Sequence, residues 1–328
     1  MKTVTLVLAG LGLLVILLLA WGAGIEPRLI DEQQETAEIP GLPAAWAGQQ
    51  VAVVADFQVG MWWDNTGTVR RVVARLVERR PAAVLIAGDF IYHPANRGGA
   101  DGSGADFAPL GPDEAEAVAS VVAEAVDLVR PLPEAGIPTY AVFGNHDYGM
   151  ESPQAARLDW AAQRLREALD AAGIRVLRNE AVALPAPGED DSQDSAGNPP
   201  LYLVGIGSRY AGRDRPAAAL AGLPEDAPRI VMMHNPDSFD RFPAGTAPLA
   251  VAGHTHGGQI RIPFTGDWSW MALVQEDRVH VDGWIANYGG PRNRLYVNRG
   301  IGFSTIPVRI HAMPEITLFT LRPAGEGE

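Results

Sequence analysis

The sequence predicts an α/β protein attached to a membrane by one N-terminal helix. Residues 4–23 are almost wholly apolar, and about 20 such residues span the hydrocarbon core of a bilayer. Residues 50–143 alternate β-branched runs with amphipathic stretches, which is the pattern of a mainly parallel sheet with helical crossovers. The second half contains short apolar runs between turn residues, so we expect it to be mostly β and antiparallel.

The apolar N-terminal run is interpreted as an uncleaved signal anchor, residues 1–24. It is long for a cleaved signal peptide, although residues 20–22 resemble a cleavage site. Lys2 precedes the run, whereas Glu26 and Asp31 follow it. The positive-inside rule therefore predicts a single-pass protein of the cell membrane whose remaining chain lies on the extracytoplasmic side.

The rest of the chain divides into a tether and one domain. Residues 25–49 are polar and contain prolines, so we expect a tether, followed by a globular domain at residues 50–323. Within this domain, residues 93–112 are expected to be a long surface loop or insertion. Residues 188–200 are acidic and rich in Gly, Pro and Ser, which is typical of a disordered segment.

The domain's elements follow from hydrophobic periodicity. Its first half is expected to contain strands at 50–55, 84–87 and 139–143, and helices at 68–80, at 113–130 before Pro131, and from Ser152-Pro153 to Gly173. Its second half is expected to contain strands at 181–184, 201–206, 230–233, 259–263, 295–298 and 316–321.

Composition restricts the chemistry of any site. The 328 residues carry a formal net charge of −13, whereas a nucleic-acid-binding face must be basic, so we expect no nucleic-acid partner. The chain has no cysteine, so a metal would be bound by His, Asp, Glu, Asn or Gln.

Side chains suited to metal binding follow one predicted strand after another. Two histidines separated by one residue lie in a Gly-rich turn, where both imidazoles can point into one space. In chain order the candidates are Asp56 and Gln58, Asp89, Asn145, His146 and Asp147, His234, and His254 and His256. Because open α/β sheets bind ligands at the carboxyl ends of their strands, we expect a common site there.

The segments Asp-x-Gln, Gly-Asp, Gly-Asn-His-Asp, His-Asn-Pro and Gly-His-Thr-His-Gly-Gly-Gln, in this order, resemble the calcineurin-like metallophosphoesterases. The resemblance covers residues 51–321 and implies a four-layer α/β/β/α sandwich with a two-metal centre. The membrane segment and residues 298–302 are similar to a branch of secreted or membrane-anchored phosphoesterases. That branch includes some UDP-2,3-diacylglucosamine pyrophosphatases.

The resemblance assigns a role to each candidate. Two divalent ions can bind a hydroxide and neutralise the phosphoryl oxygens, and a carboxylate must bridge them. The implied ions are Mn, Fe or Zn, with Mg as a further candidate. The implied bridge is Asp89. The first ion would be held by Asp56 and His256, with Gln58 at the position of a further ligand, and the second by Asn145, His234 and His254. The leaving oxygen would be protonated by His146, oriented by Asp147.

Gln58 departs from the family pattern, which has His at this position. An amide oxygen is a poorer ligand than imidazole for Zn or Fe. Three functions therefore stay open. The first is hydrolysis of a phosphodiester or pyrophosphate in a small-molecule or lipid substrate. The second is the UDP-2,3-diacylglucosamine pyrophosphatase step of lipid A synthesis, which needs a cytoplasmic domain, and the third is binding by a catalytically impaired relative.

Three further groups have open interpretations. Trp62 and Trp63 could stack on a base, line an acyl groove, pack against the tether or enter the membrane interface. Tyr92 follows Asp89 closely enough to reach the site. The late arginines could bind phosphate or be solvated surface residues: Arg292, Arg294 and Arg299.

Overall fold

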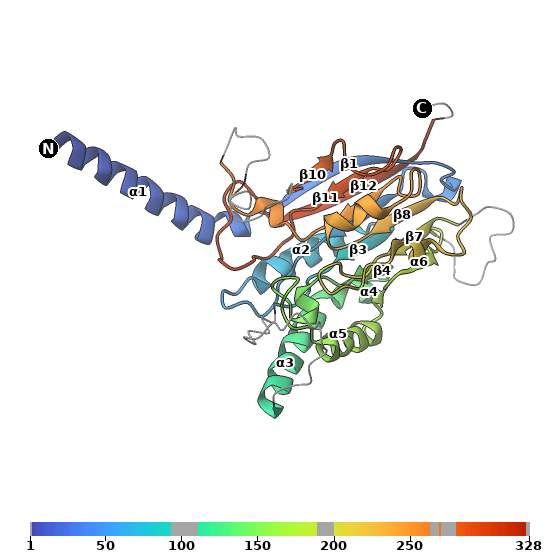
Figure 1. Cartoon of the computed structure of the whole chain (residues 1–328), viewed down its shortest axis with the longest axis horizontal. Helices are drawn as coiled ribbons and strands as arrows, with labels where there is room; N and C mark the ends of the chain where they lie inside the picture. The colour runs from blue at the N-terminus through green and yellow to red at the C-terminus, as the bar shows by residue number, and fades with distance from the viewer. Residues whose placement is uncertain (1, 93–110, 189–199, 263–268, 270–279, 326–328) are drawn as a thin grey trace.

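Two β-sheets of six strands each form the centre of the fold (Figure 1). The computed structural model describes residues 2–92, 111–188, 200–262, 269 and 280–325. Helices cover the outer faces of the sheets, which confirms the predicted α/β/β/α layers. The loop predicted at 93–112 and the disordered segment predicted at 188–200 lie almost entirely outside the described residues.

The first sheet carries the predicted parallel strands. Its order is β1 (Asp31–Ile39), β12 (Glu315–Pro323), β2 (Gln50–Val54), β3 (Ala83–Ala87), β4 (Thr139–Val142) and β5 (Arg175–Val176). Neighbouring strands from β2 to β5 pair in parallel, whereas β12 is antiparallel to β2. Because β3 is buried on both faces, its sequence is a continuous apolar run, and β4 is buried along its whole length as well.

Helices cover the outer face of this sheet through their apolar stripes. They are α2 (Thr66–Arg79), α3 (Pro112–Val129), α4 (Pro131–Glu134) and α5 (Asp159–Ala171). The helix predicted from Ser152 begins later, at Asp159. The reason is local, since Leu158 donates its backbone N–H to Tyr148 O at 2.8 Å and is held outside the helix.

The second sheet is mostly parallel, so the antiparallel prediction is wrong. Its order is β10 (Gly283–Ile285), β11 (Leu295–Val297), β9 (Ala250–Ala252), β8 (Arg229–Met232), β7 (Tyr202–Gly205) and β6 (Glu180–Ala183). Only the edge strands β6 and β10 pair antiparallel. The crossovers are short, through α6 (Pro216–Leu220) and η4 (Pro236–Arg241), and therefore give no helical periodicity.

The region predicted as a strand at 259–263 forms only isolated bridges among its described residues, including Ile260 with Ile310.

The inner faces of the two sheets bury one shared core. Val53 and Leu85 of the first sheet belong to the same cluster as Met232 and Val251 of the second.

The tether predicted for residues 25–49 is wrong, because most of this segment belongs to the domain. Strand β1 pairs in parallel with β12 over its whole length, from Asp31 with Glu315 to Ile39 with Pro323. Trp46 is buried between the sheets. The strand was missed because it lies at an edge of the sheet, where one face is solvated and accepts a charged sequence.

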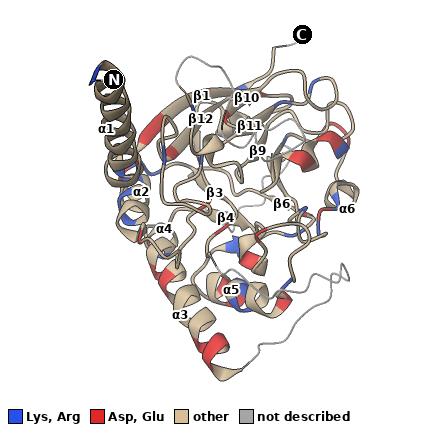
Figure 2. Ribbon diagram, turned by 60° about the vertical axis from the view of Figure 1, so that its left-hand side comes forward, with Lys and Arg blue, Asp and Glu red and all other residues tan. Residues whose placement is uncertain are grey.

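Helix α1 (Lys2–Gly24) projects from the domain and is long and apolar enough to cross a membrane. Lys2 is the charged residue of this helix, and Figure 2 shows the basic colour at the start of the helix. Its end is fixed to the domain: Arg309 N donates to Gly22 O at 2.8 Å, and a Cβ on Gly22 would lie 2.8 Å from Arg309 O. No flexible linker therefore separates the helix from the domain.

A pair of truncations tests this boundary. A chain that begins at Trp21 should keep the stability of the domain, whereas one that begins at Gly41 should lose at least about 3 kcal/mol. The second chain lacks the buried Ile39 and leaves β12 as an unpaired edge. Thermal unfolding followed by circular dichroism measures the difference, and equal stability would show that β1 is dispensable.

Candidate metal centre

The predicted site residues lie in loops that follow β2, β3, β4, β8 and β9, at the carboxyl edges of the two sheets. Two of these strands belong to the second sheet, so the site spans both. Since the loops adjoin, side chains distant in the sequence come within hydrogen-bond distance of one another, as the following contacts describe.

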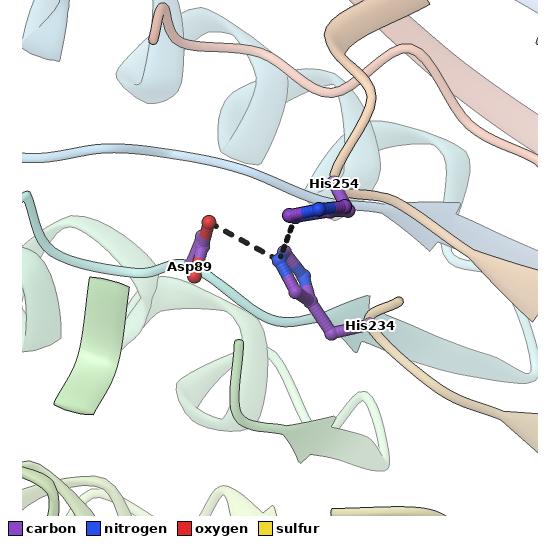
Figure 3. Close-up of side chains that lie close together, drawn as sticks. All are labelled: Asp89, His234 and His254. Carbon is purple, nitrogen blue, oxygen red and sulfur yellow. Dashed lines mark hydrogen bonds and ion pairs between the residues drawn. The ribbon is translucent and has the colours of Figure 1, made fainter. Parts of the chain in front are cut away.

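Asp89, His234 and His254 form the most compact group of potential ligands (Figure 3). One donor atom from each lies within 4.8 Å of the others. His234 Nε2 is 3.2 Å from Asp89 Oδ2 and 3.2 Å from His254 Nδ1. Two imidazole nitrogens and a carboxylate oxygen facing one point are donors that suit Mn, Fe or Zn.

The backbone orients His234 toward this point. His234 Nδ1 donates to Ala87 O at 2.8 Å, so its other nitrogen, Nε2, is left with a lone pair directed at the centre. Gly144 makes room for the arrangement, because a Cβ there would lie 2.0 Å from Asp89 Oδ1 and 2.6 Å from His234 Nε2. Glycine is therefore required at this position.

Two buried amide oxygens point to the same kind of occupant. Asn145 Nδ2 donates to Met150 O at 2.6 Å, and Gln58 Nε2 donates to Asp89 Oδ2 at 2.9 Å. Asn145 Oδ1 and Gln58 Oε1 are buried and accept no hydrogen bond from the described residues. Because a buried acceptor without a partner is costly, these oxygens fit a cation, and the donor set as a whole fits a metal centre.

The group around Asp56 is assembled more loosely. Both Asp56 carboxylate oxygens accept from His254 N, at 3.0 and 3.1 Å, while His256 Nε2 lies 3.8 Å from Oδ1. Arg309 lies behind His256, with Nη2 3.4 Å from the ring's Nδ1. The backbone N of Arg309 also binds Gly22 O, so one residue connects the end of α1 to a candidate ligand.

The candidate ligands have an unusual backbone. Asp56, Gln58, Asp89, His254 and His256 all have positive φ, between 51° and 77°. For non-glycine residues this left-handed region costs of order 1 kcal/mol or more each, and such strain is typical of functional sites. The turns are therefore held by their surroundings in the conformation that directs these side chains inward.

Burial and mutual charge shift the proton affinities of the site. Burial raises the pKa of Asp56 to about 7, against the opposing effect of His234. Burial opposes charge on the His234 ring, but the Asp89 carboxylate outweighs it and raises the pKa of His234 to about 9. Burial and the His234 charge lower the pKa of His254 to about 3. At neutral pH the metal-free centre therefore holds protons that a bound cation would displace.

Metal affinity should consequently rise with pH. Below about pH 7 both Asp56 and His234 carry protons, and each proton released on binding contributes about tenfold in affinity per pH unit. We expect Mn²⁺ to bind at least about tenfold more tightly at pH 7 than at pH 6. Calorimetric titration in buffers of different ionisation enthalpy measures affinity and proton release together. An affinity independent of pH would contradict this site.

His146 lies beside the candidate ligands without joining them. Its backbone N donates to Asp89 Oδ1 at 2.9 Å, and its ring stacks on Tyr92 with centroids 4.8 Å apart. The ring's Nδ1 is buried without a partner among the described residues, and burial lowers the pKa of the imidazole. The expected approach of Tyr92 to the site is confirmed.

Asp147, which is predicted to orient His146, contacts the backbone of the loops after β3 and β4, and the orienting role stays a prediction. Its carboxylate accepts backbone N–H groups from Asp89 at 2.9 Å, Phe90 at 2.8 Å, Ile91 at 3.3 Å and Gly144 at 2.9 Å. Because these backbone donors come from the loops after β3 and β4, the Asp147 carboxylate holds the two loops together.

The structure also places two of the residues with open interpretations, Arg299 and Trp62, and one further aromatic residue, Tyr210. Arg299 pairs with Asp31 and with Glu315, so it holds β1 and β12 rather than a free phosphate position. Tyr210, which no motif indicated, packs edge-to-face on His254 at 4.6 Å. Trp62 is 67% exposed, so its side chain is available to a partner.

Comparisons with known proteins find similar sequences of one kind. The sequence profile described as calcineurin-like phosphoesterase matches residues 50–258, which include every candidate ligand. Phosphodiesterase YaeI of Escherichia coli is 30% identical over 249 residues, covering 76% of this chain and 73% of the relative. Uncharacterized metallophosphoesterase YkuE of Bacillus subtilis is 24% identical over 298 residues, covering 91% and 87%. UDP-2,3-diacylglucosamine pyrophosphatase LpxG of Chlamydia muridarum is 26% identical over 124 residues, or 36% of each chain.

Proposed function

Because the chain belongs to the calcineurin-like phosphoesterase family and is a phosphoric ester hydrolase, we propose that it hydrolyses a phosphodiester or pyrophosphate bond at a membrane surface. The observation that carries the proposal is the convergence of Asp89, His234 and His254 with the unpartnered amide oxygens of Gln58 and Asn145. A hydrolase with two metal ions needs imidazole nitrogens and carboxylate or amide oxygens as ligands, arranged around one carboxylate that both ions share.

In this proposal each side chain has one task. Two divalent cations, when bound, supply a hydroxide and neutralise the phosphoryl oxygens. Asp89 would be shared by both ions, Asp56, Gln58 and His256 would hold the first, and Asn145, His234 and His254 would hold the second. His146 holds the proton that the leaving oxygen receives, and the stacked Tyr92 ring fixes its orientation. Asp147 positions the loops that carry Asp89 and Asn145.

The proposal is tested with the full chain in detergent. Hydrolysis of bis(p-nitrophenyl) phosphate should require a divalent cation, disappear in EDTA and return when Mn²⁺ is added in excess. A metal-loaded, folded protein without turnover would instead support the impaired relative that binds and does not hydrolyse.

In this proposal Gln58 determines whether a metal ion occupies both groups of ligands. Gln58→Ala should lower the metal content from about two ions toward one per chain, because it removes one oxygen donor from the looser group around Asp56. Gln58→His should instead restore about two ions and tighten binding of Zn²⁺, which prefers nitrogen donors. Elemental analysis of the wild type and both variants measures the counts. Identical counts and affinities in all three would place Gln58 outside the metal centre.

A lipid phosphoester is the favoured class of substrate within this proposal. Arg309 contacts both the end of the apolar helix α1, through Gly22, and the candidate ligand His256. Trp62, which follows Gln58 closely in the sequence, is exposed. The charges that flank α1 favour an extracytoplasmic domain, whereas a UDP-2,3-diacylglucosamine pyrophosphatase would need a cytoplasmic one. A reporter active only outside the cytoplasm, fused to the C-terminus, separates these two assignments.

A further inference from the structure

A cavity of about 390 Å³ lies beside α5, away from the candidate metal ligands. It is bounded by the start of α5, the edge strand β5 and the loop after β7, and its lining contains none of the residues assigned to the metal centre. Figure 2 shows α5 below β4, with arginine or lysine residues on the helix and on nearby loops. The volume lies within the range of small-molecule sites.

The cavity concentrates positive charge in an acidic protein. Arg166, Arg178 and Arg213 line it, against one carboxylate, Asp159, whereas the whole chain carries a net charge of −13. That carboxylate is already shared, because Arg213 Nη2 and Arg157 Nε both donate to Asp159 Oδ2. Arg166 Nε also lies 3.6 Å from Asp170 Oδ2, a half-exposed carboxylate outside the lining, so the lining itself contains three guanidinium groups and one carboxylate.

Several donors in the cavity have no protein acceptor. Among the described residues, Arg213 Nε and the indole N–H of Trp160 are buried without a hydrogen bond. Arg178 forms no ion pair in the described part of the chain and contacts the Tyr148 hydroxyl. Buried donors of this kind need an acceptor, which an anion would supply.

The walls are rigid and partly aromatic. Asn179 Nδ2 donates to Arg213 O at 2.6 Å, and Asn179 Oδ1 accepts from Gly207 N at 3.1 Å, so the loop that carries Arg213 is fixed in place. Trp160 and the buried Phe143 supply an apolar surface next to the charged groups. The cavity thus pairs fixed guanidinium groups with an aromatic wall.

We propose that this cavity binds an organic phosphate. Its phosphate group accepts hydrogen bonds from Arg166, Arg178 and Arg213, and its apolar or aromatic group packs on Trp160. Guanidinium groups match phosphate oxygens in geometry, and several of them suit a doubly charged group better than a single carboxylate. The site adds a ligand to the proposed hydrolase and does not depend on bound metal.

Benzylphosphonate, which joins a phosphate-like anion to an aromatic ring and cannot be hydrolysed as an ester, is the probe. Titrated into the full chain in EDTA, it should bind and change tryptophan fluorescence. Benzyl alcohol and inorganic phosphate, which each lack one half of the probe, should bind at least about tenfold more weakly. The protein has eight tryptophans, so Trp160→Phe should remove the fluorescence change while calorimetry still detects binding.

Matched arginine variants locate the site. Arg166→Ala and Arg178→Ala should each weaken binding about tenfold, because each removes a charge-assisted contact. Arg164→Ala, on the exposed face of the same helix, should leave the affinity unchanged. Equal affinity in the cavity variants and the control would overturn the proposal. Binding that appears only with Mn²⁺ would also overturn it, because the probe would then occupy the metal centre.

Discussion

Replacing Asp89 by Asn should abolish phosphodiester hydrolysis and leave the protein folded. Asp89 Oδ2 is 3.2 Å from His234 Nε2 and 2.9 Å from Gln58 Nε2, so its charge lies at the middle of the donor set. Asn retains the size and an acceptor oxygen but removes the negative charge that a bridging ligand needs. A loss of about 4 kcal/mol of transition-state stabilisation lowers kcat/KM by about 10³-fold, and we expect at least this effect.

The measurement compares turnover of bis(p-nitrophenyl) phosphate with metal content and thermal unfolding. Asp113→Asn is the matched control, because this exposed carboxylate at the start of α3 has no contact with the site. The Asp89 variant should contain less metal than the wild type, whereas the control should match it. Wild-type turnover by folded, metal-depleted Asp89→Asn would refute the two-metal assignment.

The location of the candidate metal centre could be predicted because its residues follow buried strands. Asp56, Asp89 and Asn145 come directly after apolar runs, and the carboxyl ends of parallel strands meet at one edge of a sheet. The same logic applies to His234 and His254 in the second sheet. The position of these side chains therefore follows from strand periodicity, even though the parallel direction of the second sheet did not.

Other features depend on contacts that leave no local pattern. Strand β1 is polar and is stabilised by its pairing with β12, which lies at the other end of the sequence. Arg309 belongs to no motif, yet it is fully buried between α1 and His256. The family resemblance implied that Asp147 orients His146, but it did not indicate that the Asp147 carboxylate accepts backbone N–H groups from the loops after β3 and β4. Such assignments require the tertiary structure.

Replacing His146 by Ala should slow hydrolysis according to the leaving group. A phenolate without a nitro group leaves poorly unless it is protonated, whereas p-nitrophenolate leaves without a proton. We therefore expect a loss of about 10²–10³-fold with phenyl thymidine 5′-phosphate and less than about tenfold with its p-nitrophenyl counterpart. The ring's unpartnered Nδ1 and its position beside Asp89 motivate this assignment.

Steady-state kinetics with the two esters, which differ only at the leaving group, measure this difference directly. Tyr92→Phe is the control, because it keeps the aromatic ring that stacks on His146 and removes only the hydroxyl that donates to Glu151 Oε1 at 3.1 Å. This variant should resemble the wild type with both esters, since it keeps the ring that stacks on the imidazole. An equal loss with both esters in His146→Ala would exclude proton transfer to the leaving oxygen, and the loss would then belong to another role of the imidazole, because alanine keeps the backbone N–H that donates to Asp89.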